Sequence, residues 1–426
     1  MRSSYRYLRI HLFLFCCGMA GFLGVNALVD PEGRFSFLTH PQFNQEKTEL
    51  MESGGRTSKA RALVNGAYDT VILGSSRTEN GINPQHEALA GKHAYNAALS
   101  GSNFYETYQV FAFARRHTKL STVLVGLDFL LFSSKRDVAG DFSDSGFAGR
   151  PPWLSDLHYL ASPQTFWSSW TTLQKNRSGE HALYTDRGMR DRTRMYDPAN
   201  VNHRDLFIKI LTRDFLVSQK TYGGFVYGRD RVELLRTLIA ECRSDGIALY
   251  LFIPPSHARD LEALRALGLY PLFEQWKREL TQIVAEANLP QGAGQPITLW
   301  DFSGYSSITT EDVPAADEKG KAMQWYWESS HFKKATGDLV LDRLFNYEHA
   351  SRSLPEDFGV SLSPQKIEAH LAWERDQQRR YRETHPHEVA EVEALVRITS
   401  RFRATPARYS AQVASGGVQL SQPAAH

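Results

Sequence analysis

The feature that most constrains this chain is a 20-residue run from Ile10 to Val29 that contains no Lys, Arg, Asp or Glu. A helix rises about 1.5 Å per residue, so this run covers about 30 Å, the thickness of one hydrocarbon core. Arg2, Arg6 and Arg9 precede it, and such a basic flank favours the cytoplasmic side of a membrane. We therefore predict that residues 1–30 form a cytoplasmic stub and a transmembrane signal anchor of a bacterial-type cytoplasmic membrane, with the rest of the chain periplasmic.

The end of this run leaves one alternative open. Val25-Asn26-Ala27 offers small residues at which a signal peptidase cuts, so a cleaved signal peptide competes with an uncleaved anchor. We favour the uncleaved anchor. Cys16 and Cys17 lie in the run but lack the small residue that precedes a lipoprotein cysteine, so we expect no lipid on them.

Beyond the anchor the chain holds one cysteine, so the body must be stable without an internal disulfide. This residue, Cys242, follows Val232, Leu235 and Ile239 at helical spacing. The spacing predicts a core position on a helix over residues 230–243.

The composition is that of a globular protein, with 42% hydrophobic and 23% charged residues. Lys and Arg number 49 against 47 Asp and Glu, which leaves a net charge of +2. So even a balance argues against a protein that works by binding nucleic acid.

Short apolar runs that end in Gly, Asn, Asp or Pro alternate with helical patterns, which is typical of a parallel sheet with crossover helices. We therefore predict an α/β fold with a doubly wound, mainly parallel five-stranded sheet. Ligands of such sheets bind outside the carboxyl ends of the strands, so the residues directly after each strand are the first candidates for a site. The predicted strands are Thr70 to Leu73, His93 to Asn96, Thr122 to Leu127, Ile247 to Ile253 and Ile297 to Trp300.

The strands also suggest how the chain is divided. Residues 31–350 form the predicted α/β domain, and the stretch from about 133 to 229 interrupts it. We interpret this long interruption as a helical cap. The sheet pattern ends by Leu344, so we expect residues 351–403 to be a charged helical extension and residues 404–426 a flexible tail.

The cap is rich in tryptophan and arginine. Trp153, Trp167 and Trp170 lie in it, together with an arginine cluster over residues 187–194. Caps over strand ends commonly shape substrate pockets, but we favour the interpretation that each tryptophan packs the insertion.

The loop after the first predicted strand reads Gly74-Ser75-Ser76-Arg77. A serine at the end of a strand and the start of a helix is exposed and has backbone N–H groups nearby that can stabilise an oxyanion. The alternative is that the serine only caps the helix.

A second motif, Glu328-Ser-Ser-His331, precedes a helix predicted over residues 336–345. A nucleophilic serine needs a base, and a histidine base needs a partner that fixes its tautomer. The spacing lets the Glu328 carboxylate turn back onto one imidazole nitrogen of His331 while the other nitrogen faces the serine. A solvated loop pair is the alternative.

Together these motifs resemble the SGNH hydrolase superfamily over residues 69–345. The resemblance implies an SGNH or flavodoxin-like sheet with Ser76 as nucleophile, His331 as base and Glu328 in place of the usual aspartate. It also implies an oxyanion hole that uses the backbone of Ser76 and Gly101.

One departure from the family concerns the oxyanion hole. Gly126-Leu127-Asp128 stands where the family carries Gly-x-Asn-Asp. An ionised Asp128 would repel an oxyanion, so we expect either that Asn96 or Asn103 supplies the missing donor or that Asp128 is turned away in a structural role. Asp128 and His257, which both follow strands, are further candidates for substrate contact, although the segment at His257 could simply begin a helix.

The Gly-Ser-Ser form and the anchor look closest to the SGNH-like proteins of alginate O-acetylation and teichoic-acid D-alanylation. That resemblance implies an acyltransferase or esterase, with acetyl favoured, that acts on a cell-surface or secreted glycan such as an exopolysaccharide, beside a multi-span membrane acyltransferase. The alternative is a non-catalytic glycan-binding or scaffold protein. We expect no cofactor and no metal, because no Cys/His cluster has zinc spacing and no P-loop lysine is present.

Overall fold

The computed structural model describes residues 2–35, 37–49, 55–149, 152–196, 201–289, 295–318 and 320–400. The tail expected over residues 404–426 lies outside these residues. The strands are β1 (Thr70–Leu73), β2 (Ala94–Asn96), β3 (Thr122–Gly126), β4 (Ala248–Ile253), β5 (Thr298–Asp301) and β6 (Val360–Leu362). The helices are α1 (Arg2–Val29), α3 (Gly55–Asn65), α4 (Ser76–Gly81), α5 (Phe104–His117), α6 (Pro152–Leu160), α7 (Pro163–Ser178), α8 (His203–Ile210), α9 (Arg229–Ser244), α10 (Ala258–Ala266), α11 (Tyr270–Asn288), α12 (Lys334–Phe345), α13 (Ile367–Thr384) and α14 (Pro386–Ser400).

The sheet has six strands in the order β2-β1-β3-β4-β5-β6, and the first five are parallel. β1, β2 and β3 are buried throughout, as strands covered on both faces must be. The chain places β2 on one side of β1 and then returns to place β3 on the other. At such a topological switch point the loops after β1 and β3 diverge and leave a crevice for a ligand.

Alternate side chains of the strands contribute to two hydrophobic cores. Val71 and Leu73 of β1 belong to a core that includes side chains of α5, α9 and α11. Ile72 belongs to a second core, which includes Leu339 and Val340 of α12. Because successive residues of a strand point to opposite faces, helices must cover both sides of the sheet. Cys242 lies fully buried in the first core, as its helical spacing predicted.

The five predicted strands all form, with bounds within one residue of the prediction. The expectation that the sheet pattern ends by Leu344 is wrong, because β6 pairs with β5 in the antiparallel direction. β6 is a partly exposed strand of sequence Val-Ser-Leu, so it lacks the buried apolar run that marks the parallel strands. Helices α13 and α14 follow, and the break between them falls at His385-Pro386, where a proline cannot continue a helix.

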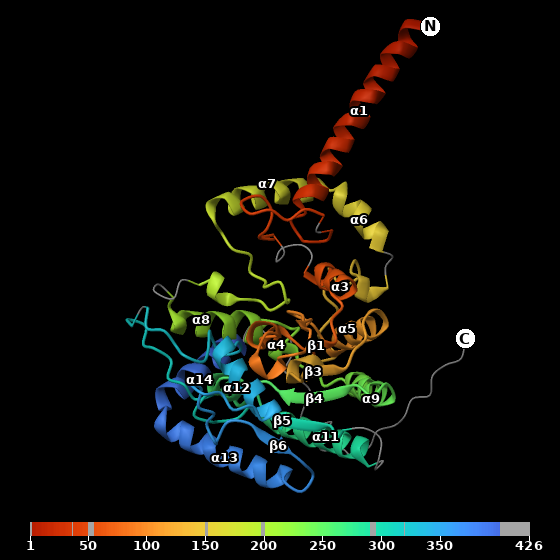
Figure 1. Ribbon diagram of the computed structural model, residues 1–426. Helices are drawn as coiled ribbons and strands as arrows, with labels where there is room; N and C mark the ends of the chain where they lie inside the picture. Colours follow the sequence, from red (N-terminus) through yellow and green to blue (C-terminus); the bar gives the residue numbers. More distant parts are fainter. Residues whose placement is uncertain are drawn as a thin grey trace, which may run out of the picture.

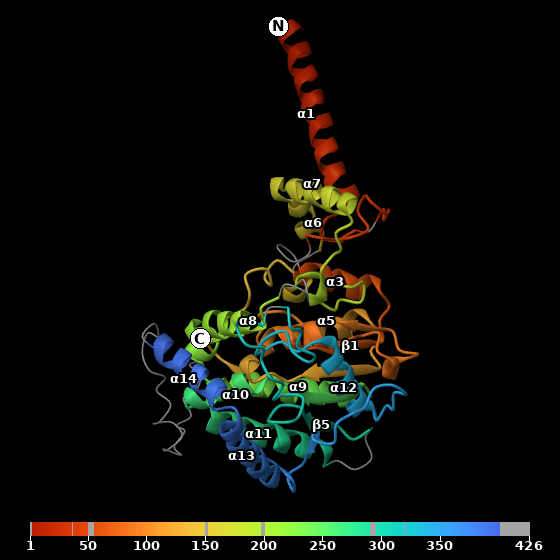
Figure 2. The same ribbon diagram turned by 90° about the vertical axis from the view of Figure 1, so that its left-hand side faces the viewer.

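Helix α1 projects from the body in both views (Figures 1 and 2), and its side chains from residue 5 to residue 21 are exposed. It is long and apolar enough to cross a membrane. Helices α6 and α7, from the predicted cap, lie at its foot, between α1 and the α/β body (Figure 1).

Candidate active site

The loops that begin at the carboxyl ends of β1 and β3 flank the crevice at the topological switch point. Ser75 and Ser76 follow β1, and Asp128 follows β3. Ser75 Oγ donates a hydrogen bond to Asp128 Oδ2 at 2.7 Å, which ties the two strand ends together. The serines predicted from the sequence therefore lie where a doubly wound sheet offers a ligand site.

Gly74 allows the sharp turn from β1 into α4. Its φ is +149°, and a Cβ at this position would lie 2.5 Å from Thr78 Oγ1, so a larger residue would clash. Ser75 then caps α4, because its Oγ accepts a hydrogen bond from Arg77 N–H at 3.2 Å. The capping role considered for the serine pair therefore belongs to Ser75, which leaves the Ser76 hydroxyl available for another partner.

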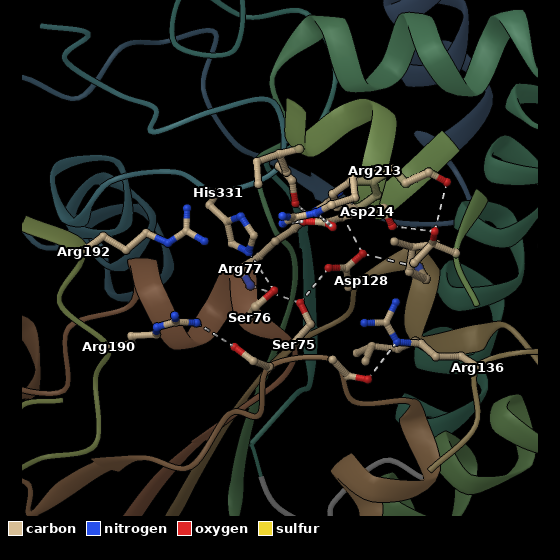
Figure 3. A pocket seen from close by; sticks show the side chains of 18 of the residues that line it. Ser75, Ser76, Arg77, Asp128, Arg136, Arg190, Arg192, Arg213, Asp214 and His331 are labelled. Atoms are coloured by element: carbon tan, nitrogen blue, oxygen red, sulfur yellow. Dashed lines mark hydrogen bonds and ion pairs between the residues drawn. The ribbon is translucent and has the colours of Figure 1, made fainter. Parts of the chain in front are cut away.

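That partner is His331, as predicted from the sequence. Ser76 Oγ lies 2.7 Å from His331 Nε2, although the two residues are 255 positions apart. The other imidazole nitrogen, Nδ1, is hydrogen-bonded to Glu328 Oε1. Trp327 N–H donates to the His331 carbonyl at 2.9 Å and closes a tight turn, which brings the Glu328 carboxylate back onto the ring. Figure 3 shows the His331 ring pointing towards Ser76.

The charges around His331 favour its neutral form. Burial lowers the pKa of His331, and the nearby Arg192 guanidinium lowers it further, against the opposing effect of Glu328. Burial alone would raise the pKa of Glu328, but His331, Arg192 and the Ser330 N–H outweigh burial and lower it to about 2. At neutral pH the imidazole is therefore uncharged and able to accept a proton, while its carboxylate partner is ionised.

A cavity of about 370 Å³ adjoins Ser76 and His331 (Figure 3). The predicted cap forms much of its wall, so the interruption of the sheet does shape a pocket. Among the described residues five arginines and two aspartates line it, which makes the wall cationic. Its charged lining residues are Arg77, Arg136, Arg190, Arg192, Arg213, Asp128 and Asp214.

Arg136 differs from several other arginines of this wall. Arg77 and Arg213 pair with aspartates, and Arg192 pairs with Glu328 at 3.2 Å. Among the described residues Arg136 forms no ion pair; its Nε donates to the Gly101 carbonyl at 3.2 Å, and its buried Nη1 has no hydrogen-bond partner. A partly buried guanidinium with an unsatisfied N–H group would be stabilised by an anion that enters the cavity.

Gly101 lines the cavity, as its implied place in the oxyanion hole requires. Neither its N–H nor that of Ser76 has a hydrogen-bond acceptor in the described part of the chain. The Ser76 N–H lies in the first turn of α4, where an N–H lacks an intrahelical acceptor. Both groups are therefore available to a bound oxyanion.

The expectation that Asn96 or Asn103 donates to the oxyanion is wrong. Both side chains are fully buried. Asn96 Nδ2 donates to the Ile82 carbonyl at 2.8 Å, and Asn103 Nδ2 donates to the Arg136 carbonyl at 2.7 Å. Asn103 also caps α5 through its side-chain oxygen. These amides hold the loops together, and neither residue is among those that line the cavity.

Asp128 has the structural role that the sequence left open. It lines the cavity, but one carboxylate oxygen accepts from Ser75 and the other lies 3.3 Å from Arg77 Nη1. The positive charge of Arg77 offsets the repulsion that an ionised Asp128 would exert on an oxyanion.

His257 does not contact the cavity, so the prediction that it touches substrate is wrong. Its side chain is buried, with Nε2 2.7 Å from the Glu311 carbonyl and Nδ1 capping α10. Burial lowers the pKa of His257 to about 3, so the ring stays neutral. The alternative, that this segment begins a helix, is confirmed by α10.

One group of described residues has the geometry of metal ligands: Asp301, His370 and Glu374. Lys277 Nζ lies 2.7 Å from both Asp301 Oδ2 and Glu374 Oε1, so an ammonium already provides the positive charge at this place. The cluster joins α13 to the sheet and lies apart from the Ser76 cavity.

Sequence reasoning missed most of the cationic wall. Arg190 and Arg192 belong to the arginine cluster seen in the cap, but nothing in their spacing assigned them to Ser76. The sequence did mark Arg77 as a residue near the site, because it directly follows the serine pair. Nothing in the sequence placed Arg136 there.

No protein-family model and no curated protein matches this chain.

Proposed function

We propose that this chain is a membrane-anchored, extracytoplasmic serine acyltransferase or esterase of the SGNH type that acts on a cell-surface or secreted glycan. The observation that carries the proposal is the series of contacts from Ser76 through His331 to Glu328, with Ser76 Oγ 2.7 Å from the imidazole, beside a polar cavity. A serine activated by a neutral imidazole that a carboxylate orients serves acyl transfer on several unrelated folds.

In the proposed reaction Ser76 Oγ attacks the acyl carbonyl of a donor ester while its proton moves to His331 Nε2. Glu328 stabilises the imidazolium, and the N–H groups of Ser76 and Gly101 donate to the oxyanion. When the intermediate collapses, His331 returns the proton to the departing donor oxygen, and the acyl group stays on Ser76. A glycan hydroxyl then takes the acyl group in a transferase, or water takes it in an esterase. His331 removes the proton of the attacking oxygen and returns it to Ser76 Oγ as the ester bond to Ser76 breaks.

The cavity wall favours a substrate that carries negative charge. Arg136 has no ion pair among the described residues, and its Nη1 is buried without a hydrogen-bond partner. A carboxylate or phosphate on the glycan would supply the missing acceptor. We favour acetyl as the acyl group, delivered by a multi-span membrane acyltransferase.

The anchor belongs to the same proposal. Helix α1 is long and apolar enough to span a membrane, and arginines lie at its start. A reporter enzyme that works only outside the cytoplasm, fused after Asp30, should be active. Activity of a cytoplasm-only reporter at the same position would contradict the proposed orientation.

The alternative is a non-catalytic glycan-binding or scaffold protein, and turnover of a small acetyl ester separates the two. We expect the purified full-length protein to hydrolyse the ester and Ser76→Ala to lose this activity while its melting temperature stays unchanged, because Ser76 packs no core. Ser75→Ala is the matched control. It removes a helix cap at a cost of about 1 kcal/mol but retains the nucleophile, so it should keep much of the activity. Equal activity of Ser76→Ala and the unaltered protein would favour the scaffold.

A further inference from the structure

Helix α7 buries a polar face and exposes apolar side chains, which reverses the usual arrangement of a surface helix. Its buried side chains are all polar: Thr165, Ser168, Ser169, Thr172 and Asn176. Its exposed face carries Trp167 and Trp170, which are 64% and 51% exposed. A helix on the surface of a soluble protein buries its apolar face instead.

Helix α6 shows the same inversion. Trp153, Leu154 and Leu157 are 67%, 43% and 56% exposed. On the inner side Ser155 accepts from Arg34 at 3.1 Å, and Tyr159 is buried with its hydroxyl bonded to the Glu32 N–H. The tryptophans predicted to pack the cap therefore face outward. We call the five exposed apolar side chains Trp153, Leu154, Leu157, Trp167 and Trp170 the apolar collar.

The collar lies where α1 reaches the body. Asn26 of α1 is fully buried; its Nδ2 donates to the Leu160 carbonyl at 2.8 Å, and its Oδ1 accepts from Ser169 Oγ at 3.2 Å. One turn earlier Phe22 stacks on Phe166 with ring centroids 5.2 Å apart. Both views show α7 crossing the foot of α1 (Figures 1 and 2).

The position of these contacts along α1 indicates the depth of α7 relative to the membrane. The uncharged run from Ile10 to Val29 covers about 30 Å at about 1.5 Å per residue, the thickness of a hydrocarbon core. Phe22 and Asn26, which contact α7, lie towards the carboxyl end of this run, so α7 lies near the end at which the helix leaves the hydrocarbon. Tryptophan is enriched at this depth, because its ring is apolar and its N–H needs a polar partner.

We infer that the apolar collar is a membrane-binding surface, and that α6 and α7 lie in the lipid interface around α1. This inference rests on the membrane anchor of the proposed function and extends it. If α1 were the only contact with the membrane, the α/β body would be free to rotate about the end of α1. Two interfacial helices joined to α1 through Asn26 fix the orientation of the body, and with it the direction in which the Ser76 cavity opens.

Tryptophan fluorescence tests the inference, since α1 contains no tryptophan. The full-length protein is reconstituted into phosphatidylcholine vesicles with or without bromine on the acyl chains, because bromine quenches only tryptophans that contact lipid. We expect brominated lipid to quench part of the emission. Replacement of Trp153, Trp167 and Trp170 by Ser should remove most of that quenching. Trp373→Ser, on α13 at the far end of the body, should leave it intact.

Two outcomes overturn the inference and differ in what else they contradict. If the protein floats with vesicles but brominated lipid quenches the unaltered protein no more than the triple variant, the collar does not contact lipid; a collar that binds membrane helices of another protein gives this result. If the protein does not float, the anchor of the proposed function fails as well. Each single variant, Trp153→Ser, Trp167→Ser and Trp170→Ser, should lose a share of the quenching, which keeps the test valid should the triple variant misfold.

Discussion

The cavity beside Ser76 and the foot of α1 both break the usual rule that charge faces water and apolar groups face the core, but in opposite ways. The cavity gathers five arginines in a partly enclosed wall. Helices α6 and α7 hide hydroxyl and amide groups and expose tryptophan and leucine. Under the two proposals, each surface matches what faces it: an anionic, polar ligand at the cavity and lipid at the collar.

The largest effect is expected at His331. Ser76 and His331 act as one unit, so His331→Ala should lower turnover of an acetyl ester on the order of 10³-fold or more, and the double variant with Ser76→Ala should be no slower than either single variant. Trp167→Ser should leave turnover of the same soluble ester unchanged in detergent. Additive losses in the double variant, measured by steady-state kinetics, would show that the two side chains do not act together.

A smaller effect is expected at Arg136. Loss of a charge-assisted hydrogen bond costs about 1.5–3 kcal/mol, so Arg136→Gln should raise KM for an acetylated, carboxylate-bearing oligosaccharide roughly 10- to 100-fold. KM for an uncharged acetyl ester should not change. Arg213→Gln is the matched control, since Arg213 lies on the same wall but is exposed and paired with Asp214. An equal effect of Arg136→Gln on charged and uncharged esters would contradict an anion site.

The pH profile should shift in opposite directions for the two charged neighbours of His331. Activity needs the neutral imidazole, so it is lost as the pH falls through the pKa of His331, which burial and Arg192 hold below the usual value of about 6.5. Arg192→Gln removes a positive charge, raises this pKa and should move the acid limb to higher pH. Glu328→Gln removes the stabilising negative charge and should move the limb to lower pH, with a smaller loss of rate than His331→Ala. Shifts of the same sign in both variants would rule out this electrostatic account.

The smallest effect is expected on the outer face of the collar. Trp167→Ser should change the free energy of unfolding in detergent by less than about 0.5 kcal/mol, because the side chain is 64% exposed. Asn26→Leu should cost about 1–3 kcal/mol, because it leaves the part-buried Leu160 carbonyl and the buried Ser169 hydroxyl without their partner. Chemical unfolding measures both. A larger cost for Trp167→Ser than for Asn26→Leu would mean that the collar packs the protein rather than facing lipid.

The sequence predicted the parallel strands and the position of Ser76 for one physical reason, whereas His331 was predicted from the Glu328-x-x-His331 spacing before a helix. Buried parallel strands are apolar runs with sharp ends, and the carboxyl ends of neighbouring strands meet at one edge. It could not predict β6, because this partly exposed edge strand contains no buried apolar run. Nor could it show that His257 lies outside the cavity, since His257 also follows a strand and its contact with the Glu311 carbonyl is made by a distant loop.

The cap was the least predictable region. Its sequence shows which residues are tryptophan and arginine, but not which side of a helix meets the body. The sequence therefore favours packing for Trp167 and Trp170, although α7 buries its polar face. Arg136 and Arg192 line the cavity because the segments around them return to the loops after β1 and β3, while α6 and α7 of the same insertion lie at the foot of α1.

The central claim is that His331 activates Ser76 as a nucleophile, and labelling with a fluorophosphonate tests it most directly. This reagent forms a stable adduct only with an activated serine. The full-length protein should carry one adduct, which peptide mass spectrometry should locate on Ser76. Ser75→Ala should be labelled as well, and His331→Ala should not. An adduct on another residue, or none on the unaltered protein, would contradict the account.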